Sequence, residues 1–181
     1  MGKSRSGDNS PRAVIFDLDL TLVDSSAAAA LRKARQWQDV YPLIPQFPVY
    51  AGINELLKWL AKEGVPVAIA TTSPRPYCTR VLAHNEWAFQ ATTCYHDTNN
   101  HKPHPDPITR TVKLLGVDPA RVLSVGDDPK DIQASRSAGV VAVAACWGCE
   151  VGVDLNEHRP DHLCETVADL DALLKTEFDK N

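Results

Sequence analysis

Residues 13–21, AVIFDLDLT, decide the fold of this chain. They place two carboxylates, Asp17 and Asp19, directly after the apolar run Ala13–Phe16. Side chains of a strand alternate between its two faces, so the two acids share a face if the extended backbone continues. The run suits a core strand, and the carboxyl ends of such strands are where α/β folds build their sites. Two acids this close repel each other unless a cation lies between them, which indicates a divalent metal.

The two carboxylates also predict a division of chemical labour. Asp17 could attack an electrophile while Asp19 moves protons, as paired catalytic carboxylates commonly do. The competing interpretation is a pair of solvated loop or helix-capping acids, and the D-x-D-x-T pattern alone leaves it open. The motifs further along the chain favour the catalytic interpretation.

The bulk composition fits one globular domain and argues against two classes of partner. The chain has 181 residues, of which 44% are hydrophobic and 23% charged, and this suffices for a single core. The net charge of −4 gives no basic footprint for nucleic acid. No apolar run approaches the ~20 residues that a membrane helix needs. We therefore expect neither nucleic acid nor a membrane as a partner.

The N-terminal segment and the cysteines bear on domain limits and location. Residues 1–11 are polar and lack the apolar stretch of a secretory signal, so we expect a short disordered tail before a single domain at residues 12–181. The five cysteines are scattered and odd in number, which favours reduced thiols over a disulfide framework. Together these features predict a cytoplasmic protein.

Apolar runs alternate with helical patterns along the chain. Five runs predict strands at residues 13–16, 65–70, 91–95, 122–125 and 140–144. Other patterns predict helices at residues 27–38, 52–63, 77–87, 106–115, 129–138 and 167–175. Gly64, Gly116 and Gly139 follow three of the helical patterns, where a glycine commonly ends a helix. The alternation predicts an α/β fold with helices on both faces of a parallel sheet.

Residues 41–50 contain Pro42, Pro45 and Pro48 and interrupt this alternation. Proline fixes its own φ and disfavours helix in the residue before it, so we expect an extended, irregular segment. The segment could form a small lid over a site or serve as a stiff linker. We favour the linker, because Pro-rich connections commonly act as spacers.

Two more groups of polar residues follow predicted strands. Thr71 and Thr72 come directly after the second strand, where hydroxyl and backbone N–H groups can bind a phosphoryl oxygen. Lys102 lies in the proline-rich run HKPHPDP, which would stiffen the loop and fix an ammonium group beside crowded negative charge. Each feature taken alone also fits an ordinary structural or solvated residue.

Residues 126–131, GDDPKD, place three acids where the fourth predicted strand gives way to a helix. Mg²⁺ prefers a few carboxylates together with water and substrate oxygens. We interpret Asp128 as the helix N-cap, because a proline follows it at the first helical position, and Asp127 as a metal ligand. Asp131 could ligate the metal directly, act through a water, or hold Lys102.

Taken together, residues 17–21 (DLDLT), 69–72 (IATT), 102–103 (KP) and 126–131 (GDDPKD) resemble the four motifs of the haloacid dehalogenase superfamily, on its phosphatase side. They appear in the order of that family and span most of the chain. The resemblance implies a Rossmann-like, three-layer αβα sandwich whose five strands take the order 5-4-1-2-3.

The resemblance also implies a role for each motif residue. Asp17 would be the nucleophile that takes the phosphoryl group as an aspartyl-phosphate. Asp19 would protonate the leaving oxygen and then activate water to hydrolyse that intermediate. Thr71 and Lys102 would bind the phosphoryl oxygens. An aspartate at position 19 points to a phosphatase or, less often, a phosphomutase, because the family's dehalogenases lack this acid. A mutase would also need a substantial mobile cap to exclude water between its two transfers.

The implied cofactor is Mg²⁺. It would be held by Asp17, by the backbone carbonyl of Asp19 and by Asp127, and Asp131 belongs to the same expected set of metal residues. The expected substrate contacts beside this set are Leu18, Thr72 and Arg75. The last of these could read a second anionic group, although a solvated arginine fits its position equally well.

Residues 24–50 and 73–101 bear on the size of any cap over the site. The first stretch holds only one predicted helix and the Pro-rich segment, and the second is used up by a helix and a strand. Neither can hold a full cap domain, so we expect an open, nearly capless site. The phosphate-ester substrate is then either a phosphoprotein of the phosphotyrosine type or a small sugar or carboxylate phosphate. A neighbouring copy could wall such a site, which would make the protein a homo-oligomer.

The competing class is a scaffold or binding protein on the same fold, with weak or lost chemistry. Such proteins usually lose the nucleophile or a metal ligand. Here the motif residues are all present, which favours catalysis. An aryl-phosphate assay with and without Mg²⁺ would separate the two classes.

Residues 146–149, CWGC, form a C-x-x-C pattern that could be a redox pair or half of a zinc site. His158, His162 and Cys164 lie downstream and could complete a zinc site. We favour incidental cysteines, because Trp-Gly after the fifth strand resembles an ordinary loop of the superfamily and a short motif needs structural context.

Overall fold

The computed structural model describes residues 13–178. Its six strands form one parallel sheet in the order β3-β2-β1-β4-β5-β6. The strands are β1 (Ala13–Phe16), β2 (Val67–Ala70), β3 (Ala91–Thr93), β4 (Val122–Gly126), β5 (Val141–Ala145) and β6 (His162–Cys164). The predicted α/β class is confirmed, and the five predicted strands recur in the expected order. The predicted tail at residues 1–11 lies outside the described residues.

The sixth strand, β6, was missed by the prediction of five. It has only three residues and pairs with β5 at the edge of the sheet. Leu163 is 39% exposed and His162 is partly exposed, so the segment lacks the apolar run that identifies a buried strand. The sheet therefore extends one strand beyond the expected five.

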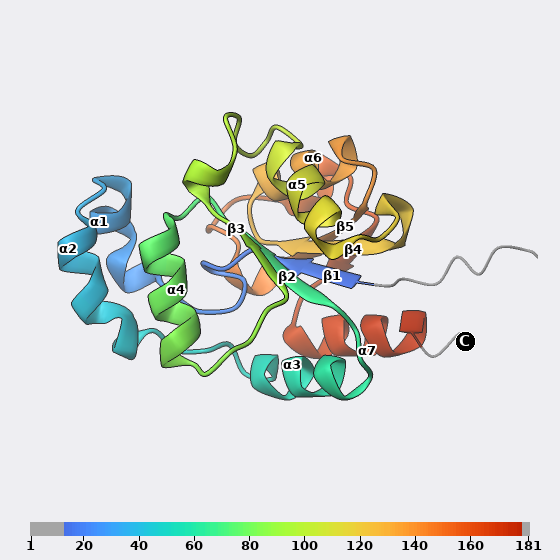
Figure 1. Cartoon of the computed structure of the whole chain (residues 1–181), viewed down its shortest axis with the longest axis horizontal. Coiled ribbons are helices and arrows are strands. Elements are labelled where there is room, and N and C mark those ends of the chain that lie inside the picture. The colour runs from blue at the N-terminus through green and yellow to red at the C-terminus, as the bar shows by residue number, and fades with distance from the viewer. Residues whose placement is uncertain (1–12, 179–181) are drawn as a thin grey trace, which may run out of the picture.

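Five long helices cover the two faces of the sheet (Figure 1). They are α3 (Ile53–Lys62), α4 (Arg75–His84), α5 (Asp106–Leu115), α6 (Pro129–Ser137) and α7 (Val167–Phe178). Val14 and Phe16 of β1 pack in one hydrophobic cluster with α3, α4 and α7, whereas Ala13 and Ile15 pack with α5 and α6 in another. This alternation follows from the two-residue period of a strand and confirms the three-layer arrangement.

The spacing of apolar residues in the sequence predicts which side of α3 faces the core. In α3 the buried residues are Ile53, Leu56 and Leu60, which recur at three- and four-residue steps. Gly64 and Gly116 adopt φ of 68° just beyond α3 and α5, a left-handed conformation that ends a helix at little cost for glycine. No helix within residues 13–178 is long and apolar enough to cross a membrane.

Residues 24–50 form a compact insert beside α4 (Figure 1). It contains the short helices α1 (Ala29–Lys33) and α2 (Trp37–Val40) and two 3₁₀ helices, Ser26–Ala28 and Tyr41–Gln46. The single helix predicted at residues 27–38 is wrong, because Arg35 takes a left-handed φ of 57° and breaks it in two.

The Pro-rich segment also differs from its prediction. Most of it is helical rather than extended, since Tyr41–Gln46 forms a 3₁₀ helix. Pro42 lies at its start, where a missing backbone N–H costs nothing, and such short helices need few hydrogen bonds. Ile44 and Phe47 are buried in the main core, so the segment packs onto the domain.

Candidate active site

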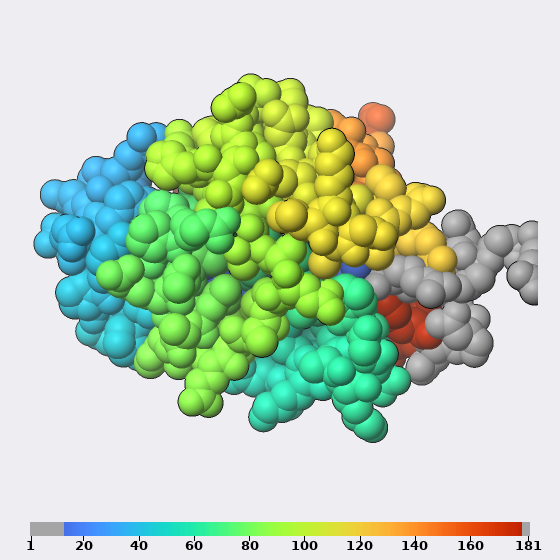
Figure 2. Space-filling model, in the orientation of Figure 1, coloured from blue at the N-terminus to red at the C-terminus, as the bar shows by residue number. Residues whose placement is uncertain are grey.

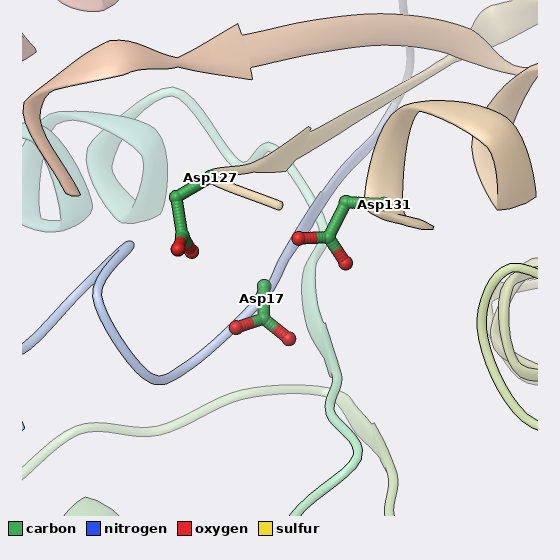
Figure 3. Close-up of side chains that lie close together, drawn as sticks. All are labelled: Asp17, Asp127 and Asp131. Atoms are coloured by element: carbon green, nitrogen blue, oxygen red, sulfur yellow. The ribbon is translucent and has the colours of Figure 1, made fainter. Parts of the chain in front are cut away.

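Three carboxylates converge at the carboxyl end of the sheet. Asp17 follows β1, Asp127 follows the neighbouring strand β4, and Asp131 lies in the first turn of α6. One carboxylate oxygen of each lies within 4.8 Å of the others, and their side chains point toward a common space (Figure 3). Carboxylate oxygens in this arrangement are what a hard divalent cation prefers. The sheet topology brings together acids that are 110 positions apart in the sequence.

Neighbouring groups hold Asp127 and shape the space around it. The hydroxyl of Thr21 donates a hydrogen bond to Asp127 Oδ1 at 2.6 Å. Gly126 lies directly against Asp131, and a Cβ at this glycine would overlap the Asp131 side chain. Burial raises the pKa of Asp127 well above its usual range, and the charges of Asp17 and Asp131 raise it further. A bound cation would offset this repulsion.

Lys102 is the positive group of the site. Its Nζ lies 2.8 Å from Asp17 Oδ1 and 2.6 Å from Asp131 Oδ1, and its side chain is only 4% exposed. Burial alone would lower the pKa of Lys102, but these two carboxylates outweigh it and raise the pKa above its ordinary value. The lysine is therefore charged and engages one oxygen of Asp17. Burial raises the pKa of Asp17, whereas the lysine lowers it.

The first turn of α6 holds Asp131 in place. Asp128 caps the helix by accepting a hydrogen bond from the Lys130 N–H at 2.8 Å. Asp131 in turn accepts one from the Asp128 N–H at 3.1 Å, which completes a capping box. The prediction of Asp128 as the N-cap is confirmed. Of the three roles left open for Asp131, the structure displays the contact with Lys102.

The side chain of Asp19 lies outside the metal group. Its carboxylate pairs with Arg32 Nη2 at 2.6 Å and accepts hydrogen bonds from the hydroxyls of Ser73, at 2.7 Å, and Tyr77, at 2.5 Å. The carboxylate is thus buried among three donors instead of facing the other acids. A metal contact through its side chain does not occur in this arrangement, and the backbone contact expected for it stays a prediction.

Of the residues expected to contact the phosphoryl group or the substrate, Thr71 and Leu18 have buried side chains, whereas Thr72 lines the cavity. Thr71 is buried at the end of β2, and its hydroxyl oxygen accepts a hydrogen bond from the Ser73 N–H at 3.1 Å. Thr72 is exposed and lines the cavity described below. Leu18 has a fully buried side chain, so only its backbone can reach a ligand at the site.

Arg75, the remaining expected substrate contact, lies away from the site. Its guanidinium pairs with Asp97 and donates to Thr92 Oγ1 at 2.8 Å, beside β3. It is absent from the lining of the cavity that holds the acids. The structure therefore does not bring Arg75 to the site, and its charge is already matched by a carboxylate.

A cavity of about 350 Å³ opens over the acids and the lysine. Its lining joins loops from β1, β2, β3 and β4 to one residue of the insert, Arg32. The residues that line it are Asp17, Asp19, Leu20, Arg32, Thr72, Tyr95, His101, Lys102, Asp127, Asp128, Lys130 and Asp131. A phosphate group placed here would meet Lys102, Arg32 and the carboxylate of Asp17.

Sequence analysis missed Arg32, Ser73 and Tyr77, the partners of Asp19. Ser73 directly follows the pair of threonines and could have been noticed. Arg32 reaches the site only because the insert folds back against α4, and no local pattern signals that contact. Thr21 was in the opening motif, but its bond to Asp127 spans 106 positions.

The C-x-x-C segment has a structural place beside the site. The Trp147 indole N–H donates to the Thr21 carbonyl at 3.0 Å, and Gly148 packs against the Leu20 backbone so closely that a Cβ would collide with it. Among residues 13–178, the acidic trio is the only group of three or more His, Cys, Asp or Glu that is close enough to share a metal ion. Cys146 and Cys149 are not disulfide-bonded, and the interpretation that they are incidental stays a prediction.

Comparison with known families agrees with the fold. A family model described as haloacid dehalogenase-like hydrolase matches residues 30–145. The chain therefore belongs to the haloacid dehalogenase-like hydrolase family, and the resemblance seen in its motifs is confirmed.

Two sequence relatives illustrate the range of the family. The chain is 30% identical over 124 residues to phosphoglycolate phosphatase of Escherichia coli strain K12, covering 67% of this chain and 49% of that protein. It is 30% identical over 123 residues to pyrophosphatase PpaX of Bacillus cereus strain AH820, covering 67% and 57% respectively. The aligned part of the chain thus spans about half the length of these relatives.

Solved structures share the fold over nearly the whole chain. A hydrolase from Pseudomonas syringae superposes with a TM-score of 0.77 at 23% identity, covering 91% of this chain and 98% of that one. CbbY from Rhodobacter sphaeroides, in complex with phosphate, superposes with a TM-score of 0.76 at 18% identity, covering 88% and 96%. At these identities the likeness establishes the fold alone.

Proposed function

We propose that this protein is a Mg²⁺-dependent phosphatase that hydrolyses a phosphate monoester through an aspartyl-phosphate on Asp17. One observation carries the proposal: Lys102 binds one oxygen of Asp17 at 2.8 Å, and within residues 13–178 no donor contacts the other oxygen. Asp17 also lines the cavity, so we take its second oxygen as the atom that attacks phosphorus.

The donor set fits a magnesium ion. Asp17, Asp127 and Asp131 offer only carboxylate oxygens, and burial among like charges raises the pKa of the first two, so a cation is the natural partner. Asp17 and Asp127 would hold the ion, with Asp131 close by and shared with Lys102. When bound, the ion would neutralise charge on the transferring phosphoryl group.

The chain's own residues can perform each proton and bond step. Asp17 attacks phosphorus as the leaving-group oxygen departs, and Asp19 gives that oxygen its proton. Asp19, now ionised, takes a proton from the water that attacks the aspartyl-phosphate, and inorganic phosphate leaves. Lys102 and the hydroxyl of Thr71 stabilise the charge on the phosphoryl oxygens, which is most of what phosphoryl transfer needs.

Three partners of Asp19 support its role as the acid and base. Arg32, Ser73 and Tyr77 fix the carboxylate of Asp19 at the wall of the cavity. Fixed orientation is what makes a general acid effective. Because Arg32 comes from residues 24–50, we propose that this insert is the minimal cap of the enzyme.

The relatives favour a small phosphate ester over a phosphoprotein as substrate. The Escherichia coli and Bacillus cereus proteins are named for small phosphate compounds, phosphoglycolate and pyrophosphate. A cavity of about 350 Å³ at Asp17 is of the size that holds a small ligand. The free cysteines also fit a reducing compartment, so we propose that the enzyme works in the cytoplasm.

A direct assay separates catalysis from a scaffold role. We expect hydrolysis of p-nitrophenyl phosphate that needs added Mg²⁺ and falls at least about a thousandfold in Asp17→Asn. Asp171→Asn, at a partly exposed position on α7 outside the cavity lining, is the matched control and should keep full activity. A folded wild-type protein that binds Mg²⁺ but hydrolyses no ester would favour the scaffold. Full activity in Asp17→Asn would overturn the proposed nucleophile.

A further inference from the structure

A second hollow adjoins the catalytic cavity. It has a volume of about 630 Å³ and lies between the insert and the loops after β2 and β3. It shares five lining residues with the catalytic cavity: Arg32, Thr72, Tyr95, Asp128 and Lys130. The insert, blue in Figure 2, abuts the yellow-green segment that follows β3. A ligand with its phosphoryl group at Asp17 would extend past Tyr95 into this hollow.

The hollow gathers positive charge. Lys33, Arg35 and Lys130 line it together with Arg32, and the one acid in its lining is Asp128. Arg32 is already paired with Asp19, and the Lys130 ammonium lies 4.0 Å from Asp128, at the limit of an ion pair. Within residues 13–178 no carboxylate pairs with either of the other two cations. A chain with a net charge of −4 therefore concentrates unmatched positive charge beside its catalytic acids.

Arg35 lies in the turn between α1 and α2, where its side chain contacts Tyr95. This residue adopts a left-handed φ of 57° between α1 and α2, a conformation that disfavours any residue other than glycine. This conformation ends α1, because the Gln36 N–H donates a hydrogen bond to the Leu31 carbonyl at 2.9 Å. Here the guanidinium carbon lies 5.4 Å from the centroid of the Tyr95 ring, and Nη2 lies 3.3 Å from the tyrosine hydroxyl.

Tyr95 links Arg35 to the loop that carries Lys102. Its ring stacks on His101 with 3.9 Å between centroids, and His101 directly precedes Lys102 in the chain. Arg35, Tyr95 and His101 thus form a continuous wall from the insert to the catalytic lysine. At one end of this wall the Arg35 guanidinium lines the hollow, and at the other end His101 lines the catalytic cavity beside Lys102.

We infer that this hollow binds a second anionic group of the substrate, a carboxylate or a second phosphate, through Lys33, Arg35 and Lys130. The inference rests on the proposed phosphatase function and narrows its substrate to small phosphate esters that carry another negative charge. The role expected for Arg75, contact with a second anionic group, thus passes to two residues of the insert and to Lys130 of α6. Arginine and lysine groups that converge on an anion give charge-assisted hydrogen bonds, which are stronger than neutral ones.

Matched substrate pairs test the inference. The carboxylate arm compares 3-phosphoglycerate with glycerol 3-phosphate, and the phosphate arm compares glucose 1,6-bisphosphate with glucose 6-phosphate. We expect wild-type kcat/KM to favour the second anion by about tenfold or more in at least one arm. In the double variant Lys33→Gln/Arg35→Gln this preference should fall to about twofold or less. The control Lys62→Gln/Arg110→Gln removes the same charges at exposed positions on α3 and α5 and should keep the preference.

A binding measurement keeps the inference separate from catalysis. Titration calorimetry of 3-phosphoglycerate and glucose 1,6-bisphosphate into Asp17→Asn should give a Kd that rises about tenfold or more when Lys33→Gln/Arg35→Gln is added. The control pair should leave the Kd unchanged. Weakened binding without turnover of any ester would support the anion site and count against the phosphatase. Equal kcat/KM within both pairs, or a Kd that the double variant does not change, would overturn the inference and leave the phosphatase standing.

Discussion

Replacing Gly126 by alanine should destabilise the fold, because there is no room for a methyl group at this position. A Cβ there would overlap the Cβ and Cγ of Asp131, which is 5% exposed and held by Lys102 and the helix cap. In Gly126→Ala the Asp131 side chain must leave its place or β4 must shift away from α6. Either change breaks the 2.6 Å contact with Lys102 and the capping bond to the Asp128 N–H.

The size of the effect follows from the contacts that are lost. Losing the buried contact between Asp131 and Lys102 costs about 3 kcal/mol in stability. This is the lower end of the usual range, because Lys102 is still paired with Asp17. Losing the capping bond costs about 1 kcal/mol. Together these lower Tm by roughly 10 °C in a domain of this size. Activity should fall as well, because Asp131 helps to hold the lysine against the nucleophile.

Thermal unfolding followed by circular dichroism measures the change, with p-nitrophenyl phosphate turnover in parallel. The control is Gly116→Ala, where φ is 68° and no atom lies within 4 Å of the added Cβ. It should cost only the left-handed strain, about 1 kcal/mol or roughly 3 °C. A Gly126→Ala protein that melts no lower than this control and keeps full turnover would refute the packing argument.

Three further predictions concern the same groups. Thr21→Val removes the hydroxyl that holds Asp127 at 2.6 Å, and the concentration of Mg²⁺ needed for half-maximal activity should rise about tenfold; no change would show that this bond does not position the ligand. Burial raises the pKa of Asp17 to about 7 and that of Asp127 to about 9, so the metal-free protein binds more protons when folded and its free energy of unfolding should fall as pH rises from about 4 to about 9. The rise in Tm on adding Mg²⁺ should grow over the same range, and a rise independent of pH would count against these shifts. Tyr77→Phe removes a 2.5 Å donor from Asp19 and should lower kcat about tenfold with little change in KM, whereas a rise in KM alone would place this tyrosine in substrate binding.

The placement of the acids could be predicted from the sequence, because it depends only on strand order. Apolar runs identify β1 and β4, and each run ends at an acidic motif. Once these strands are neighbours in a parallel sheet, Asp17 and Asp127 must meet at the same edge. The N-cap role of Asp128 was likewise readable, since an aspartate followed by proline is a strong start signal for a helix.

The surroundings of Asp19 could not be read from the sequence. Its donors come from the insert, from the loop after β2 and from α4, and their meeting depends on how these pieces dock. Helical propensity predicts one helix through residues 27–38, and the break at Arg35 opposes that local preference. The short edge strand β6 has no apolar pattern of its own and exists because β5 offers it an edge.

The central claim is that Asp17 carries the phosphoryl group, and Asp19→Asn offers the most direct test. Nitrophenolate leaves without a proton, so phosphoryl transfer to Asp17 can proceed in this variant, whereas hydrolysis of the intermediate lacks its base. With p-nitrophenyl phosphate and Mg²⁺ we predict a burst of about one nitrophenolate per chain, followed by slow turnover. Mass spectrometry of the acid-quenched protein should then place one phosphoryl group on the peptide that contains Asp17. Turnover without a burst and without covalent phosphate, or a phosphoryl group on another residue, would contradict the account.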